Sequence, residues 1–340
     1  MTGFFRLCKK YFHTAPGLIA SVLLLSACGS PPVLTWEEIP LPKIDGARSN
    51  LSLGAIRFIN GNFFAVGGFM ILSSPDGKDW SLRHKGQNGL SGIAHGSGAF
   101  VAVGSDSTGS GGWVLTSPDG SVWENTPLPE KKWLSAVTYG KGRFVAVGYD
   151  TTVLVSTDGK SWSPRKDDLP RLGTLYNVEF GNGLFVATGQ SGTILTSPDG
   201  FSWTQRTSDT RRELYGIAFG DGRFVAVSND FWCSDVRAFV SRDGVAWEAE
   251  DTDSDEDLRG ICFGGGVFMA VGGNNRSGGR GNIDITQVDD KGCMIVSSRN
   301  GEIWRVNECP SGRQLHGVAF GNNRFVAVGN GIILRSSPLR

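Results

Sequence analysis

The stretch Ser197-Pro-Asp-Gly-Phe-Ser-Trp203 decides the fold, because the pattern Ser-x-Asp-Gly-x-x-Trp recurs along the chain. Its copies are Ser74–Trp80, Ser117–Trp123, Ser156–Trp162, Ser197–Trp203, Ser241–Trp247 and Ser298–Trp304, the last with Asn300 in the place of Asp. Asp accepts hydrogen bonds from nearby backbone N–H groups, and Gly takes the positive φ that a tight hairpin needs. The Trp can fold its apolar face back onto the sheet while its N–H finds a partner. Each copy therefore predicts a turn that leads into the fourth strand of a structural unit.

A second phrase precedes the turns and is clearest as Leu214-Tyr-Gly-Ile-Ala-Phe-Gly-Asp-Gly-Arg-Phe-Val-Ala-Val227. It predicts a buried first strand, a glycine turn and a β-branched second strand. The phrase starts at Leu53, Leu90, Leu134, Leu175, Leu214, Leu258 and Leu315, with spacings of 37 to 57 residues. A period near 40 residues with strand-like units is typical of a β-propeller, in which a ring of blades buries both faces of each sheet. The sequence therefore predicts an all-β, seven-bladed propeller of four-stranded blades.

The last unit lacks its turn, since the chain stops at Ser336-Ser-Pro-Leu-Arg340. The missing strand is supplied near the N-terminus, where Trp36–Pro42 matches Trp123–Pro129. We therefore expect a strand over residues 34–40 to complete the last blade and close the ring. The propeller domain is expected over residues 44–340.

The repeat resembles the Asp-box, or BNR repeat, of sialidase-like propellers, although each copy in this chain is one residue shorter between Asp and Gly. The resemblance covers Trp36 to Arg340, and the blade plan is also similar to that of photosystem II assembly-factor propellers, which are non-enzymatic chaperones. A sialidase-type reaction needs three Arg, a Tyr activated by Glu, and an Asp acid. The family's Arg-Ile-Pro start motif is absent, and Tyr149, Tyr176 and Tyr215, with Glu213, are not in a convincing pattern. We therefore predict a non-catalytic scaffold that binds a protein or glycan, with a sialidase-like glycoside hydrolase as the alternative.

The N-terminal residues predict export. A basic start with Arg6, Lys9 and Lys10 is followed by an apolar run from Pro16 to Leu25, which is too short for an ordinary transmembrane span. The run ends in Leu25-Ser-Ala-Cys28, which resembles a bacterial lipobox. The resemblance implies that residues 1–27 are a signal peptide, that Cys28 is lipidated, and that 28–43 form a tether. The expected location is the outer membrane, facing the periplasm or the cell surface; the alternative is an ordinary signal peptide with an incidental cysteine.

Charge and cysteine content narrow the possible partners. Removing residues 1–27 leaves 30 basic against 33 acidic residues, a balance that does not suggest nucleic-acid binding. An even number of cysteines in an exported chain favours disulfides over metal. Cys293 and Cys309 flank the turn at Asn300 and are expected to pair, while a Cys233–Cys262 bridge is a weaker expectation. We predict a monomer without a metal or cofactor.

The ligand is expected at the mouth of the central channel, where the first strands begin. The residue after the first-strand Leu varies around the ring and includes Tyr176, Tyr215, Arg259 and His316. A cation lies at or just before each start: Arg48, Lys85, Lys132, Arg171, Arg212, Arg259 and Arg313. Arg can hold a carboxylate or phosphate in bidentate fashion, so the predicted partner is an acidic envelope protein or glycan. The alternatives are ordinary solvated cations at the mouth and a partner that binds the long insertion 273–292.

Overall fold

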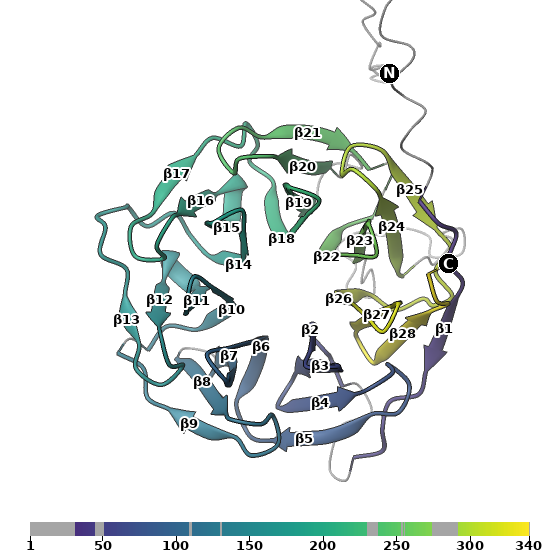
Figure 1. The fold of residues 1–340 in the computed structure, drawn as a ribbon, viewed down its shortest axis with the longest axis horizontal. Helices are drawn as coiled ribbons and strands as arrows, with labels where there is room; N and C mark the ends of the chain where they lie inside the picture. Colours follow the sequence, from purple (N-terminus) through teal and green to yellow (C-terminus); the bar gives the residue numbers. More distant parts are fainter. Residues whose placement is uncertain are drawn as a thin grey trace, which may run out of the picture.

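The computed structural model describes residues 31–44, 51–108, 111–129, 131–229, 237–252, 254, 256–273 and 292–339. It shows seven four-stranded antiparallel blades arranged in a ring, with the first strand of each blade at the central channel (Figure 1). The prediction of an all-β, seven-bladed propeller is confirmed. No helix among these residues is long and apolar enough to cross a membrane.

The first four blades follow one another along the chain, and the strands of each run in order from the inner to the outer edge. Blade 1 comprises β2 (Ala55–Ile59), β3 (Asn62–Gly67), β4 (Met70–Ser74) and β5 (Ser81–Lys85). Blade 2 comprises β6 (Gly89–Gly96), β7 (Ala99–Ser105), β8 (Gly112–Ser117) and β9 (Glu124–Thr126). Blade 3 comprises β10 (Leu134–Gly140), β11 (Arg143–Gly148), β12 (Val153–Ser156) and β13 (Ser163–Pro164). Blade 4 comprises β14 (Leu175–Gly181), β15 (Leu184–Gly189), β16 (Ile194–Ser197) and β17 (Thr204–Arg206).

The last three blades have the same order from the inner to the outer edge. Blade 5 comprises β18 (Glu213–Gly220), β19 (Arg223–Asn229), β20 (Arg237–Ser241) and β21 (Glu248–Asp251). Blade 6 comprises β22 (Leu258–Gly264), β23 (Val267–Gly272), β24 (Met294–Ser298) and β25 (Trp304–Asn307). Blade 7 comprises β26 (Leu315–Gly321), β27 (Arg324–Gly329), β28 (Ile332–Ser336) and β1 (Trp36–Ile39). Short 3₁₀ turns, η1 (Tyr149–Thr151) and η2 (Gln190–Gly192), link the second and third strands of blades 3 and 4.

An aromatic residue near the end of each first strand packs within its own blade and, in every blade except blade 2, also against the preceding blade. The aromatic residue near the end of every first strand packs on the Phe of the second strand, with ring centroids 4.5–4.8 Å apart in all seven blades. In every blade except blade 2, the same ring also covers a glycine of the preceding blade; a Cβ on Gly140, for example, would lie 2.2 Å from the ring of Phe180. These glycines are therefore required by the close approach of the blades.

The repeated turns have the hydrogen bonds that the sequence predicts, as blade 3 illustrates. Asp158 Oδ1 accepts the backbone amides of Lys160 (2.8 Å) and Ser161 (2.7 Å), and Ser156 Oγ accepts the amide of Gly159 (2.8 Å). Gly159 has φ +76°, and its carbonyl accepts Trp162 Nε1–H (2.9 Å). The amide of Ser161 is the main reason that the pKa of Asp158 falls to about 2. The turn is therefore a self-contained device that fixes the Trp against its blade.

The N-terminal strand closes the ring, as predicted, although it spans Trp36–Ile39 rather than 34–40. β1 pairs with β28 in antiparallel register, with Trp36 opposite Ser336 and Ile39 opposite Ile333. The six Trp residues of the complete turns each donate Nε1–H to the turn glycine. Trp36 Nε1 is buried and has no partner among the described residues. Residues 30–35, directly before Trp36, do not have the Ser-x-Asp-Gly pattern that supplies this acceptor to the other six.

Three of the cysteines, Cys262, Cys293 and Cys309, lie in or next to blade 6. Cys293 and Cys309 lie on either side of the β24–β25 hairpin and form a disulfide, with their Cα atoms 6.1 Å apart. Cys262 is a buried free thiol on β22, and burial raises its pKa to about 12. Cys233, its weaker predicted partner, lies outside the described residues. Within the part of the chain that the structure describes, no three His, Cys, Asp or Glu side chains form a group that could hold a metal ion.

Candidate binding site at the channel mouth

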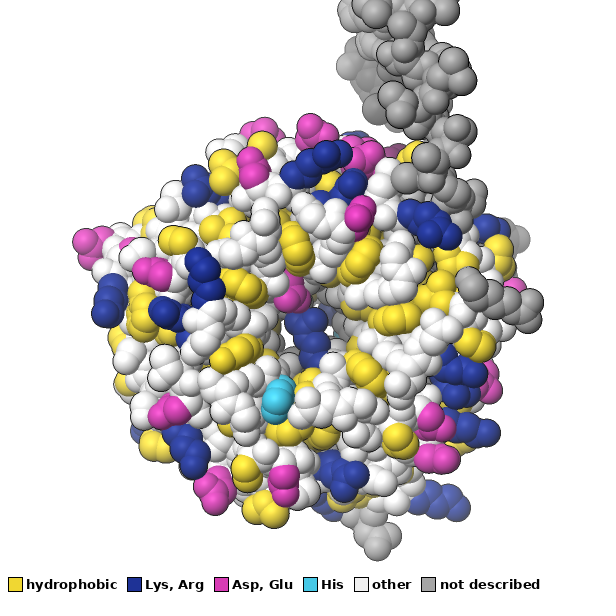
Figure 2. Space-filling model, viewed as in Figure 1, with side chains coloured by type: hydrophobic (Ala, Val, Ile, Leu, Met, Phe, Trp, Pro, Cys, Tyr) yellow, Lys and Arg dark blue, Asp and Glu magenta, His cyan; other side chains and the backbone are white. Residues whose placement is uncertain are grey.

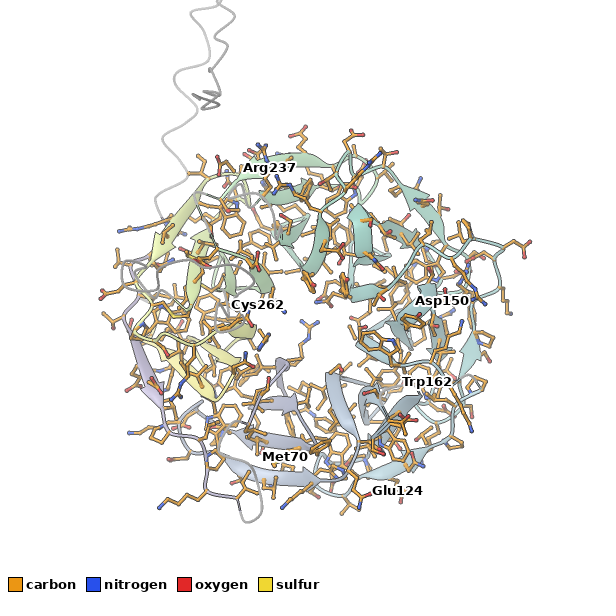
Figure 3. The ribbon with its side chains drawn as sticks, turned by 180° about the vertical axis from the view of Figure 1, so that it is seen from behind. Met70, Glu124, Asp150, Trp162, Arg237 and Cys262 are labelled. Carbon is orange, nitrogen blue, oxygen red and sulfur yellow. A yellow bond between two sulfur atoms is a disulfide. The ribbon has the colours of Figure 1, made fainter. Side chains whose placement is uncertain are left out.

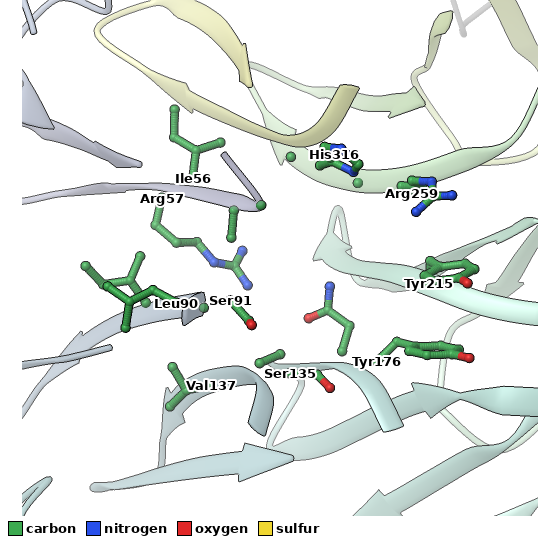
Figure 4. Close-up of a pocket in the computed structure, with 18 of the residues that line it drawn as sticks. Ile56, Arg57, Leu90, Ser91, Ser135, Val137, Tyr176, Tyr215, Arg259 and His316 are labelled. Carbon is green, nitrogen blue, oxygen red and sulfur yellow. The ribbon is translucent and has the colours of Figure 1, made fainter. Parts of the chain in front are cut away.

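All seven blades contribute to a cavity of about 490 Å³ where the first strands begin. We call this cavity the channel mouth. Its wall includes Ser91, Ser135, Tyr176, Tyr215, Arg259 and His316, which follow the first-strand Leu in six of the blades (Figure 4). The structure thus brings together the variable residues that the repeat singled out, because this position has no neighbouring strand on the channel side.

Two tyrosines form one wall of the mouth. The rings of Tyr176 and Tyr215 are stacked, with centroids 4.4 Å apart and planes 13° from parallel. Tyr176 Oη donates to Glu213 Oε2 at 2.7 Å, and Glu213 Oε1 also accepts the amide of Ser191 at 3.3 Å. Burial and then the hydrogen bond to Glu213 raise the pKa of Tyr176, and burial raises the pKa of Tyr215. Both phenols are therefore held in the protonated form; the O–H of Tyr176 is used by Glu213, and the two stacked rings offer contact surface.

Arg259 and His316 continue the wall beyond the tyrosines. The guanidinium of Arg259 lies 5.3 Å from the centroid of the Tyr215 ring, and its Nε is buried without a hydrogen-bond partner among the described residues. Arg259 forms no salt bridge with any residue that the structure describes. His316 Nε2 lies 3.0 Å from Asn330 Oδ1, an oxygen that can only accept, so Nε2 carries the proton. Burial lowers the pKa of His316, and this part of the wall therefore presents a cation beside a neutral imidazole.

Two of the predicted cations lie elsewhere. Lys132 Nζ and Arg171 Nη1 both contact Asp150 Oδ2, at 3.2 and 2.9 Å. Asp150 belongs to η1, and Figure 3 shows it toward the outer part of its blade, away from the central opening. These two cations are therefore drawn together by a local acid and do not join Arg259 at the mouth.

Three more of the predicted cations, Arg313, Arg212 and Lys85, also lie outside the mouth wall. Arg313 Nη1 donates to the carbonyl of Gly331 at 2.6 Å and lies 3.4 Å from Glu38 Oε1 on β1. Arg212 precedes β18, and its backbone amide donates to Thr210 Oγ1 at 3.1 Å. Arg48 lies outside the described residues. Lys85 ends β5, the outer strand of blade 1. Within the described residues, the predicted ring of cations is thus reduced at the mouth to Arg259.

The structure also shows an ion pair across the channel that was not predicted from the sequence. Arg57 Nη2 of blade 1 lies 3.3 Å from Glu179 Oε2 of blade 4, and Arg57 reaches into the central opening opposite the two tyrosines (Figure 4). Figure 2 shows a Lys or Arg side chain inside the opening of the ring. Arg57 belongs to the mouth wall and, with Glu179, to the wall of a second cavity further along the channel. Arg57 therefore borders both cavities, and Glu179 borders the second.

Comparisons with known proteins agree with this architecture. No family model matches the chain, and no curated protein matches it at a significant level. Among solved structures, YCF48 from Cyanidioschyzon merolae is 17% identical, covers 88% of this chain and 98% of its own, and superposes with a TM-score of 0.63. YCF48 bound to D1 peptide is 16% identical, covers 91% of this chain and 99% of its own, and superposes with a TM-score of 0.63. A catalytically inactive virginiamycin B lyase from Staphylococcus aureus, solved with quinupristin, is 10% identical, covers 90% of this chain and 100% of its own, and superposes with a TM-score of 0.69. At these identities the likeness concerns the fold.

Proposed function

We propose that this protein is a non-catalytic binding scaffold whose channel mouth holds an acidic segment of a partner protein. The observation that carries the proposal is Arg259, a cation with a buried, unpaired Nε beside a stacked pair of tyrosines in the described part of the chain. A buried donor without a partner costs free energy until an acceptor arrives, and an arginine beside aromatic rings suits a carboxylate. A propeller with a similar ring of blades, YCF48, has been solved with a peptide, which supports a protein partner.

The proposed setting is the cell envelope. The basic start, the short apolar run and Leu25-Ser-Ala-Cys28 support export and lipid anchoring through Cys28. The residues between Cys28 and the buried Leu34 would then tether the propeller to the outer membrane, with the mouth free to meet envelope partners. A glycan partner is distinguished from a protein partner by the experiment below.

A photo-crosslinking amino acid at Ser91, on the mouth wall, tests where the partner binds. The control position is Lys160, an exposed residue in a turn at the opposite end of the blades. We expect a crosslinked protein from Ser91 and none from Lys160, with the crosslink lost in Arg259→Met, retained in part in Arg259→Lys, and weakened by added salt. A crosslink from Lys160 alone, or one that persists in Arg259→Met, would contradict the proposal; a crosslinked glycan would replace the protein partner.

A sialidase-type hydrolase is the second candidate, because Tyr176 and Glu213 form a Tyr–Glu pair at the mouth. The raised pKa of Tyr176 is unfavourable for a nucleophile, and the mouth wall contains only Arg57 and Arg259 among the described arginines. Hydrolysis of a fluorogenic sialoside by the wild type, abolished in Tyr176→Phe, would establish the enzyme. Equal background rates for both proteins would exclude this reaction.

A further inference from the structure

A second cavity, of about 370 Å³, lies at the end of the channel opposite the mouth. We call it the lower cavity. Blades 1, 2 and 3 line it with Arg57, Asn60, His95 and Tyr139, and blade 4 contributes Glu179. At the repeat positions of Arg57 and Glu179, and of His95 and Tyr139, most of the other blades have apolar residues.

The repeat itself shows which of these side chains packing does not require. The fourth residue after the first-strand Leu is small and buried in five blades, where it is Ala94, Thr138, Ala218, Cys262 or Ala319. Blades 1 and 4 have Arg57 and Glu179 at this position instead, and both side chains reach the channel. Since an alanine satisfies the packing of this position elsewhere in the ring, the two charges need another explanation.

The next position of the repeat points to the same cavity. It is Phe in five blades, and His95 and Tyr139 replace Phe only in blades 2 and 3. A smaller ring at His95 fits beside Ile59, which stands where the other blades have glycine. Tyr139, however, covers Gly96 as the phenylalanines cover their glycines, and its Oη lies 2.8 Å from Ser97 Oγ. The hydroxyl therefore adds a polar group that the packing does not need.

The two charges have unused hydrogen-bonding capacity toward the described residues. A guanidinium carries five N–H donors, and Arg57 uses one, toward Glu179 at 3.3 Å. Glu179 Oε1 accepts the amide of Phe180 at 3.1 Å, which leaves further lone pairs on both carboxylate oxygens. The exposed fractions of the two side chains are 34% and 18%, so both remain accessible from the cavity. A single ion-pair contact thus leaves most of the donors and acceptors open to a ligand.

We propose that the lower cavity binds a small zwitterion of the α-amino acid class. Its carboxylate would take the free N–H groups of Arg57 in bidentate fashion, and its ammonium would donate to Glu179. The two protein charges sum to zero, which matches a zwitterion; a polyanion would be repelled by Glu179 and a cation by Arg57. Asn60, Tyr139 and His95 supply the polar surface around the ligand's remaining atoms.

The test measures the thermal unfolding midpoint of the full chain with each standard L-amino acid in turn at millimolar concentration. Acetate and ethylamine serve as probes with a single charge. A ligand that binds the native state raises the midpoint. We expect at least one amino acid to raise it, acetate and ethylamine to leave it unchanged, and Arg57→Met to abolish the shift. Glu179→Gln should weaken amino-acid binding and allow acetate to raise the midpoint, because Arg57 then has no acidic neighbour.

Two matched variants keep the test decisive if Arg57→Met fails to fold. Tyr139→Phe restores the side chain of the other blades and should weaken binding about tenfold. Arg259→Met, at the channel mouth, should leave amino-acid binding unchanged. The proposal is overturned if no amino acid raises the midpoint, if Tyr139→Phe and Glu179→Gln bind as the wild type does, or if Arg259→Met abolishes the shift.

Discussion

Truncating the apolar residues of the N-terminal segment should destabilise the whole ring. Leu34 and Ile39 are 5% and 4% exposed, and they enter different clusters. Leu34 packs among residues of blades 6 and 7, such as Ile295 and Phe325, whereas Ile39 packs among residues of blades 7 and 1, such as Leu53. The segment therefore fastens blade 7 on both sides.

The expected magnitude follows from this burial. Replacing a buried Leu or Ile by Ala costs about 2–5 kcal/mol of the free energy of unfolding, through lost transfer energy and the cavity that remains. The two side chains are five residues apart on an extended segment, roughly 16 Å, so their effects should add. The double variant Leu34→Ala/Ile39→Ala should lose about 4–10 kcal/mol, a large part of the roughly 5–15 kcal/mol typical of a folded protein.

Urea unfolding followed by Trp fluorescence and far-ultraviolet circular dichroism measures this loss. Val33→Ala is the matched control, because Val33 is 70% exposed and should change the free energy of unfolding by no more than about 0.5 kcal/mol. If Leu34→Ala and Ile39→Ala unfold at the same urea concentration and with the same slope as Val33→Ala, the N-terminal segment does not hold the ring closed and the reasoning fails.

Four further predictions concern the anchor, the mouth, the turns and the disulfide. Cys28→Ser should move the protein from the membrane fraction to the soluble fraction; a variant that stays in the membrane would refute lipid anchoring. Burial lowers the pKa of His316 below its ordinary value of 6.5, so its contribution to stability is present above pH 6.5 and is lost as the pH falls through the lowered pKa. His316→Gln should flatten this part of the stability–pH curve, and an unchanged curve would show that another group causes it. Ser156→Ala should cost about 1–3 kcal/mol of the free energy of unfolding, since it leaves a buried backbone amide unpaired; a loss comparable to that of an exposed Ser→Ala change would contradict this. Peptide mapping without reduction should find Cys293 joined to Cys309, and replacing both by Ser should cost about 3 kcal/mol for a bridge that spans 16 residues; any other pairing would disprove the assignment.

The fold could be predicted because the same strand and turn patterns recur in nearly every blade. The spacing of the first-strand leucines set the number of blades, and the match of Trp36–Pro42 to Trp123–Pro129 showed where the ring closes. The turn bonds followed from the chemistry of Asp, Gly and Trp, since all partners lie within a few residues. Trp36 shows the limit of this reasoning, because the match predicts its place in the blade but not that its Nε1 lacks a partner among the described residues.

The site was predicted less completely, because its contacts join residues that are far apart in the sequence. Arg259 was found from its position in the repeat, whereas the attraction of Lys132 and Arg171 to Asp150 depends on η1, where Asp150 has φ +56°. The pair of Arg57 and Glu179 is separated by 122 positions and crosses the channel. If every position of the repeat is compared between blades, the fourth residue after the first-strand Leu is Arg57 in blade 1 and Glu179 in blade 4. A comparison of the first-strand starts alone does not reveal these two charges.

The closure of blade 7 also has a consequence in time. β1 (Trp36–Ile39) is synthesised long before its partner β28 (Ile332–Ser336), because the other strands of the ring lie between them in the sequence. At about 5–20 residues per second, β1 waits roughly 15–60 s before β28 exists. During this interval it is a short strand without a neighbour, and Glu37 and Glu38 at its centre are the charges that discourage pairing with a wrong chain. The acidic middle of β1 thus suits a strand that must remain single until β28 has been produced.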